Sequence, residues 1–133
     1  MADRVPDMTE AATSSGVKPV TFFITRHGQT LYNVASLVQG WCDSQLTDEG
    51  VRVARQLGRG LADVDFAHAY SSDAGRAIQT LNAVLSARAE ANPLARLPQI
   101  HIPDDRLREW CYGGYEALSS FCSSKSYVFH LHK

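Results

Sequence analysis

One short segment constrains the fold of this chain more than any other. Residues 20–25 read VTFFIT, a run that is apolar almost throughout and rich in β-branched and aromatic side chains. Such a run is typical of a strand that is buried on both faces of a parallel sheet. Arg26, His27 and Gly28 follow it directly, at the carboxyl end of the strand, where open α/β sheets bind their ligands.

Later segments continue this pattern of alternating elements. The expected elements, in chain order, are a helix from Thr47 to Leu61, a strand at 66–70, a helix that Ser71–Asp73 can cap and that stops at Asn92, and a strand at 99–102. Strands that alternate with helices predict an α/β fold. We expect a three-layer α/β/α arrangement with a mostly parallel sheet and right-handed crossovers.

The length of 133 residues suits one domain of ordinary size. We interpret residues 1–18 as a disordered leader, because they lack the apolar core of a secretory signal. Residues 19–117 form the predicted domain. Residues 118–133 form an atypical tail, since neither alanine nor arginine occurs after Ala117. This shift in composition indicates a domain that is truncated at its C-terminus.

Composition gives little support to several classes of partner. A net charge of -1 predicts neither nucleic-acid nor membrane binding, and no apolar run is long enough to span a bilayer. The cysteines, Cys42, Cys111 and Cys122, lack the spacing of a zinc site or a disulfide framework. We therefore expect a cytoplasmic protein without a metal or cofactor. The sequence leaves the oligomeric state open.

Two further charged residues follow the later elements and could act at one site. Arg76 lies at the start of the second predicted helix, where free N–H groups attract anions, and it could hold a phosphoryl group together with Arg26. The alternative is a solvated surface arginine. Glu109 follows the last predicted strand and could act as a general acid. Its alternative is an exposed partner for Arg106 or Arg108.

Four motifs in this order make the chemistry more specific. They are Thr25–Thr30 with Asn33, Gln39–Gly50, Tyr70–Ala77, and Leu107–Glu109 followed by Gly113–Glu116. Together they resemble the signature segments of the histidine phosphatase superfamily, which includes the phosphoglycerate mutases. The resemblance covers about residues 20–117, nearly the whole predicted domain.

The resemblance implies a role for each matched residue. His27 would accept the phosphoryl group through a ring nitrogen, and Glu109 would protonate the departing oxygen and later help to activate water. The implied phosphate-binding residues are Arg26, Asn33, Gln39, Gly40 and Arg76. Arg26 and Arg76 would also offset charge in the transition state, so that no metal is required. The implied partner is a small phosphorylated substrate.

One expected residue of the family is missing from the sequence. The family has a second catalytic histidine beside a glycine, after a later apolar strand. His68 and His101 come before Glu109, which is the wrong order, while His130 and His132 lack the glycine. Losing one donor of this kind typically lowers the rate by about 100- to 1000-fold.

These observations leave several functions open. The favoured interpretation is a metal-independent phosphomonoester phosphatase that acts through phosphohistidine and is impaired by truncation. The alternatives are phosphoryl transfer of the phosphoglycerate mutase type and a non-catalytic fragment that binds phosphate. A metal-dependent hydrolase has little support, because the five histidines show no H-x-x-x-H spacing.

Overall fold

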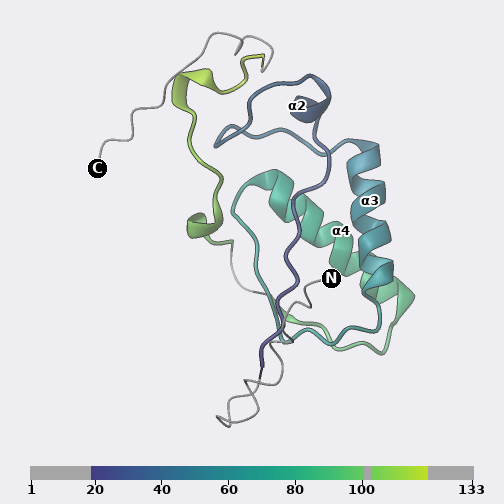
Figure 1. The fold of residues 1–133 in the computed structure, drawn as a ribbon. Helices are drawn as coiled ribbons and strands as arrows, with labels where there is room; N and C mark the ends of the chain where they lie inside the picture. Colours follow the sequence, from purple (N-terminus) through teal and green to yellow (C-terminus); the bar gives the residue numbers. More distant parts are fainter. Residues whose placement is uncertain (1–18, 101–102, 120–133) are drawn as a thin grey trace, which may run out of the picture.

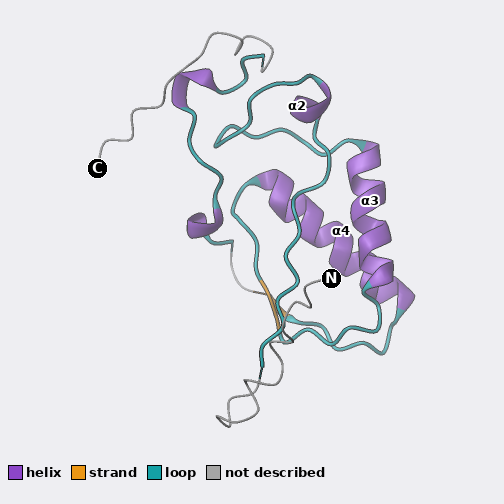
Figure 2. Cartoon of the chain, viewed as in Figure 1, coloured by secondary structure: helices purple, strands orange, loops and turns teal. Residues whose placement is uncertain are grey.

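A computed structural model of the protein describes residues 19–100 and 103–119. Figures 1 and 2 show two long helices beside extended segments and short turns. The elements are α2 (Leu31–Val34), α3 (Asp48–Gly60), β1 (His68–Ala69), α4 (Gly75–Ala91), β2 (Gln99–Ile100), and the 3-10 turns η2 (Asp105–Leu107) and η3 (Gly113–Tyr115).

The strands β1 and β2 form a short parallel pair. His68 pairs with Gln99 and Ala69 with Ile100, and α4 makes the crossover between the two strands. The strand predicted at 66–70 and the first half of the strand predicted at 99–102 are therefore found, although both are short. Residues 101 and 102 lie outside the described residues. The parallel pair and its helical crossover confirm the α/β class.

The first predicted strand is wrong as a regular strand. Residues 20–25 are drawn as loop in Figure 2 and form no ladder with any other part of the chain that the structure describes. Phe22 is 77% exposed and Ile24 is 92% exposed. An apolar run becomes a central strand only when neighbouring strands bond it and helices cover it. Here Phe23 packs edge-on against Phe66, with ring centres 5.2 Å apart.

Helices α3 and α4 pack closely against each other, as Figure 1 shows. Thr47 caps α3 as predicted, because its side chain accepts a hydrogen bond from the Gly50 amide at 3.0 Å. The contact between the helices depends on small residues. A Cβ atom added at Gly58 would lie only 2.2 Å from the Val84 carbonyl oxygen. Close approach of the two backbones therefore requires glycine here.

The start of α4 differs from the prediction. Its N-cap is Ala74, which has no capping side-chain hydrogen bond, rather than a member of the Ser71–Asp73 cluster. Ser72 instead accepts a hydrogen bond from the Ala74 amide at 3.3 Å, and Asp73 pairs with Arg108. The cluster therefore shapes the turn before the helix.

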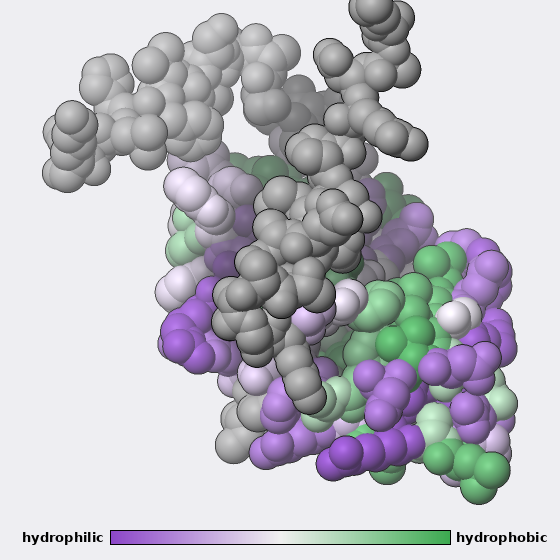
Figure 3. All heavy atoms as spheres, turned by 60° about the horizontal axis from the view of Figure 1, so that its bottom comes forward, coloured by the Kyte–Doolittle hydropathy of each residue, from purple (hydrophilic) through white to green (hydrophobic). Residues whose placement is uncertain are grey.

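The apolar core of the described residues is small. Its buried members are Ala54, Val84 and Ala87, all on α3 or α4. Figure 3 shows hydrophobic side chains that remain exposed on one face, bordered by hydrophilic ones. Arg88 is 1% exposed and donates to the carbonyl oxygens of Val64 at 2.6 Å and Arg96 at 2.9 Å. Arg88 therefore joins the loop that follows α3 to the loop that follows α4.

Neither of the long helices could cross a membrane. Among the residues that the structure describes, no helix combines sufficient length with sufficient apolar character.

Candidate functional site

Hydrogen bonds to α4 fix the segment that carries His27. The Gly28 amide donates to the Thr80 hydroxyl at 2.9 Å, and the same hydroxyl donates to the Arg76 carbonyl oxygen at 2.7 Å. A Cβ atom at Gly28 would lie 2.8 Å from the Gly50 carbonyl oxygen, so the backbone also passes close to the first turn of α3. The chain following His27 is therefore held between two helix starts.

The environment of His27 favours a neutral ring with one defined tautomer. Its Nδ1 atom lies 2.8 Å from the Gly28 carbonyl oxygen. A carbonyl can only accept, so Nδ1 carries the proton and Nε2 keeps a lone pair. Burial lowers the pKa of His27, and the positive charges of Arg76 and Arg26 lower it further. The hydrogen bond to Gly28 and the charge of Asp43 act in the opposite direction.

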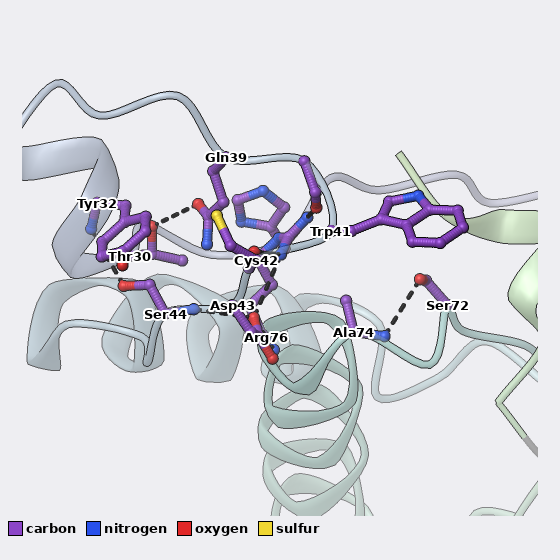
Figure 4. Close-up of polar contacts among 12 residues, drawn as sticks. Thr30, Tyr32, Gln39, Trp41, Cys42, Asp43, Ser44, Ser72, Ala74 and Arg76 are labelled. Carbon is purple, nitrogen blue, oxygen red and sulfur yellow. Dashed lines mark hydrogen bonds and ion pairs between the residues drawn. The ribbon is translucent and has the colours of Figure 1, made fainter. Parts of the chain in front are cut away.

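Arg76 is buried, so its interpretation as a solvated surface residue is wrong. It is 4% exposed and lies in the first turn of α4. Its Nη2 donates to the Gly40 carbonyl oxygen at 2.8 Å, and its Nη1 donates to the Cys42 carbonyl oxygen at 3.1 Å and to the Asp43 carboxylate at 3.2 Å. Figure 4 shows Arg76 at the helix start, beneath the loop that carries Cys42 and Asp43. The guanidinium therefore organises this loop.

Glu116 holds the same loop from the other side. Its carboxylate accepts hydrogen bonds from the amides of Trp41 at 2.8 Å, Tyr112 at 3.0 Å and Cys42. The pKa of Glu116 is lowered to about 2, chiefly by the hydrogen bond from the Trp41 amide. The carboxylate is thus ionised at neutral pH. Gly40 cannot carry a side chain here, since a Cβ atom would lie 2.4 Å from the Trp110 carbonyl oxygen.

Asn33 and Gln39 meet at the fully buried Thr30. Thr30 and Asn33 form a capping box at the start of α2, in which the Asn33 side-chain oxygen accepts from the Thr30 amide at 3.0 Å. The Thr30 hydroxyl donates to the Gln39 side-chain oxygen at 2.9 Å, as the dashed line in Figure 4 shows. The Gln39 side-chain nitrogen is buried and has no hydrogen-bond partner in the described part of the chain. Gln39 therefore keeps an unused donor.

Two pockets are lined by most of the residues that the sequence singled out, whereas Asn33 and Gln39 line neither. One, of about 260 Å³, is lined by Gly40, Arg76 and Glu109 together with Trp41, Asp43, Asp73 and Arg108. The other, of about 300 Å³, is lined by Arg26 and His27 together with residues of α3 and Thr80. Arg76 relates the two pockets to each other. It lines the pocket that contains Glu109, and its positive charge lowers the pKa of His27 in the other pocket. Arg26 and Glu109 do not share a pocket.

Glu109 is exposed, and its side chain accepts a hydrogen bond from the next amide, that of Trp110, at 2.8 Å. Its carbonyl oxygen accepts from the Trp41 indole nitrogen at 3.0 Å, which fixes its backbone. The two arginines considered as its alternative partners pair elsewhere: Arg106 with Asp104, and Arg108 with Asp73. The Arg108 guanidinium also lies 4.7 Å from the Trp41 ring centre.

Sequence reasoning missed three residues that shape the site: Asp43, Thr80 and Glu116. Asp43 and Glu116 fall inside matched motifs but received no role of their own. Thr80 lies beyond the Tyr70–Ala77 motif and gave no signal. The residues that the structure describes contain no group of three or more histidine, cysteine, aspartate or glutamate side chains that could hold a metal ion.

Comparisons with known proteins show which family the chain resembles. The family model described as "Histidine phosphatase superfamily (branch 1)" matches residues 22–127. A 2,3-bisphosphoglycerate-dependent phosphoglycerate mutase of Maricaulis maris is 41% identical over 100 residues, which make up 71% of this chain and 37% of the relative. Fructose-2,6-bisphosphatase TIGAR of Xenopus tropicalis is 43% identical over 94 residues, which make up 70% of this chain and 32% of the relative.

Solved structures give the same result. Bacillus stearothermophilus YhfR superimposes with a TM-score of 0.63 at 39% identity, over 73% of this chain and 44% of that one. A mycobacterial glucosyl-3-phosphoglycerate phosphatase in complex with VO3 gives a TM-score of 0.57 at 30% identity, over 71% of this chain and 43% of that one. The chain thus spans less than half the length of each of these four relatives.

Proposed function

This chain belongs to the histidine phosphatase superfamily, branch 1, and from that membership we propose that it is a metal-independent phosphomonoesterase that uses His27 as its nucleophile. The observation that carries the proposal is the state of the His27 ring. Its Nδ1 proton points to the Gly28 carbonyl oxygen, its pKa is lowered by burial, and Nε2 is left as a nucleophile.

The proposed reaction has two steps. In the first, the Nε2 atom of His27 attacks phosphorus, the bond to the ester oxygen breaks, and Glu109 gives that oxygen a proton. In the second, Glu109 takes a proton from water, the water oxygen attacks phosphorus, and the bond to Nε2 breaks to release phosphate. Arg26 and Arg76 offset the charge on the phosphoryl oxygens. The remaining proposed contacts to the phosphate are Asn33, Gln39 and the Gly40 backbone.

The unused donor of Gln39 supports this assignment of the phosphate site. A buried N–H group without a partner is costly, and a phosphoryl oxygen would satisfy it. Arg76 also retains capacity for a ligand, because its three hydrogen bonds occupy three of the five donors of a guanidinium.

Among the described residues, His27 is the histidine that lines either pocket, while His68 lies in β1. His27 is therefore the residue that we propose carries the phosphoryl group.

The experiment is hydrolysis of a chromogenic phosphomonoester in the presence of a chelator. We expect activity that survives the chelator, together with acid-labile phosphate bound to the protein. His27→Ala abolishes both, whereas His68→Ala, a histidine outside both pockets, serves as the matched control. Activity that needs a metal, or that persists at full rate in His27→Ala, contradicts the proposal.

Phosphoryl transfer of the mutase type is the second candidate, because the Maricaulis maris relative is named a phosphoglycerate mutase. It requires that the phosphoryl group on His27 pass to an acceptor sugar acid or alcohol instead of water. The two are distinguished by adding a monophosphoglycerate to protein whose His27 carries a labelled phosphoryl group. The label moves to the acceptor in a mutase and to inorganic phosphate in a phosphatase. Tight binding of vanadate without any labelling favours a phosphate-binding fragment.

A further inference from the structure

The peptide group between Gly40 and Trp41 is held at both of its ends. Its carbonyl oxygen accepts a hydrogen bond from the Arg76 guanidinium at 2.8 Å, and its N–H donates to the Glu116 carboxylate at 2.8 Å. A trans peptide has its C=O and N–H groups on opposite sides. The cation therefore faces the negative end of this dipole and the anion faces the positive end, which makes both hydrogen bonds charge-assisted.

Cys42 also contacts both charged groups, through two successive peptide groups. Cys42 donates its amide to Glu116 and offers its carbonyl oxygen to Arg76 at 3.1 Å. Arg76 and Glu116 are not an ion pair in the described structure; they act on each other through the backbone between them. The loop at residues 40–42 thus connects the buried Arg76 on α4 with Glu116, which follows η3 late in the sequence.

The backbone around Glu116 is anchored as well. Ala117 donates to the Val38 carbonyl oxygen at 2.8 Å, and Val38 donates to the Leu118 carbonyl oxygen at 2.9 Å. Leu37 and Ser119 form an antiparallel bridge just beyond them. Because the loop and the Glu116 segment are joined on both sides, the carboxylate has little freedom to follow the loop if the loop moves.

We propose that Glu116 is a positioning residue for phosphate binding, which orients the 40–42 loop so that the Arg76 guanidinium keeps its two remaining N–H donors directed at the ligand. The inference rests on the proposed function, since it assigns the anion to Arg76. Removing the negative charge frees the peptide to rotate. Arg76 then loses its carbonyl acceptors and reorients toward Asp43, its remaining partner. Glu116 itself touches no phosphate.

The test uses Glu116→Gln in the full chain, which removes the charge and keeps the shape. Orthovanadate affinity is measured by tryptophan fluorescence, because Trp41 lines the pocket of Arg76. Amide hydrogen exchange is measured in parallel for residues 40–43 and for α3 and α4. The control is Glu90→Gln, which removes another carboxylate, one that pairs with Arg55 outside both pockets.

We expect Glu116→Gln to weaken vanadate binding and to speed exchange at the Trp41 and Cys42 amides, each by roughly tenfold to a hundredfold. Exchange in α3 and α4 stays unchanged, which separates positioning from general loss of structure. Unchanged vanadate affinity with faster loop exchange overturns the inference, as does unchanged loop exchange.

Two further outcomes are also decisive. If the wild-type chain binds no vanadate, the proposed function fails, and the exchange measurement alone decides whether Glu116 orients the loop. If Glu116→Gln does not fold, Glu116→Asp replaces it. This variant keeps the charge but shortens the side chain by one methylene, and an affinity equal to that of the wild type then overturns the inference.

Discussion

Replacement of Thr80 by valine tests the link between α4 and the segment that carries His27. Thr80 is 5% exposed, and its hydroxyl both accepts from the Gly28 amide and donates to the Arg76 carbonyl oxygen. Valine has nearly the same shape but cannot accept a hydrogen bond. The Gly28 amide is thereby left without an acceptor in a partly buried position, while the Arg76 carbonyl keeps its helical hydrogen bond.

The expected loss of stability follows from that unpaired amide. A buried donor deprived of its partner costs about 1–3 kcal/mol. For a domain of this size, each kcal/mol corresponds to a fall of about 4–8 °C in Tm. The Gly28 segment also gains freedom, so the pKa of His27 is expected to move back toward its ordinary value.

The assays are urea unfolding followed by circular dichroism and an NMR titration of the His27 ring. Thr80→Ser is the matched control: it keeps the hydroxyl and loses only a methyl group. We expect the serine variant to retain the lowered pKa of His27 and the valine variant to lose it. The reasoning is refuted if the valine variant matches the wild type in both unfolding and titration.

Three other perturbations test separate features. Gly58→Ala places a Cβ atom 2.2 Å from the Val84 carbonyl oxygen and is expected to cost about 1–3 kcal/mol in urea unfolding, whereas Gly60→Ala, which meets nothing within 4 Å, is expected to be neutral or slightly stabilising. His27 has a lowered pKa when folded, so its contribution to stability is present above pH 6.5 and is lost as pH falls below that value. The urea midpoint is therefore expected to fall as the pH is lowered from 6.5, and a midpoint that stays constant contradicts this prediction. Ile24→Thr, at a side chain 92% exposed, is expected to change the free energy of unfolding by less than about 0.5 kcal/mol, whereas a loss of several kcal/mol places Ile24 in a buried strand.

Local signals predicted the helices better than the first strand. The cap at Thr47 and the glycines near the end of α3 act within a few residues, so the sequence contains the information needed to place that helix. A central strand is different, because residues 20–25 can be buried only by segments that lie elsewhere. Their apolar composition indicates that they require neighbouring segments for burial, and no such segments cover them among the residues that the structure describes.

The candidate site was predicted in part for a similar reason. Motif order singled out His27, Arg76 and Glu109 as candidates, yet it gave no account of what orients them. Thr80 and Glu116 act by binding backbone groups that are distant in sequence, and any residue type with an oxygen at the right place could have done so. The partners in such contacts cannot be inferred from the local sequence, even where the residue lies in a matched motif, as Glu116 does. They become visible only once the loop, the helix start and the far segment are seen together.

The small core between α3 and α4 has a consequence for how the chain responds to its solution. With only Ala54, Val84 and Ala87 as buried apolar residues in the described part, the packed state has little stability of its own. An anion that contacts residues from several segments binds only when those segments are folded together. Binding of the anion and folding of the chain are therefore coupled. At a concentration 100 times its Kd, such a ligand adds about 2.7 kcal/mol to the free energy of unfolding. A phosphate ion bound at the proposed site would therefore shift this equilibrium toward the assembled state.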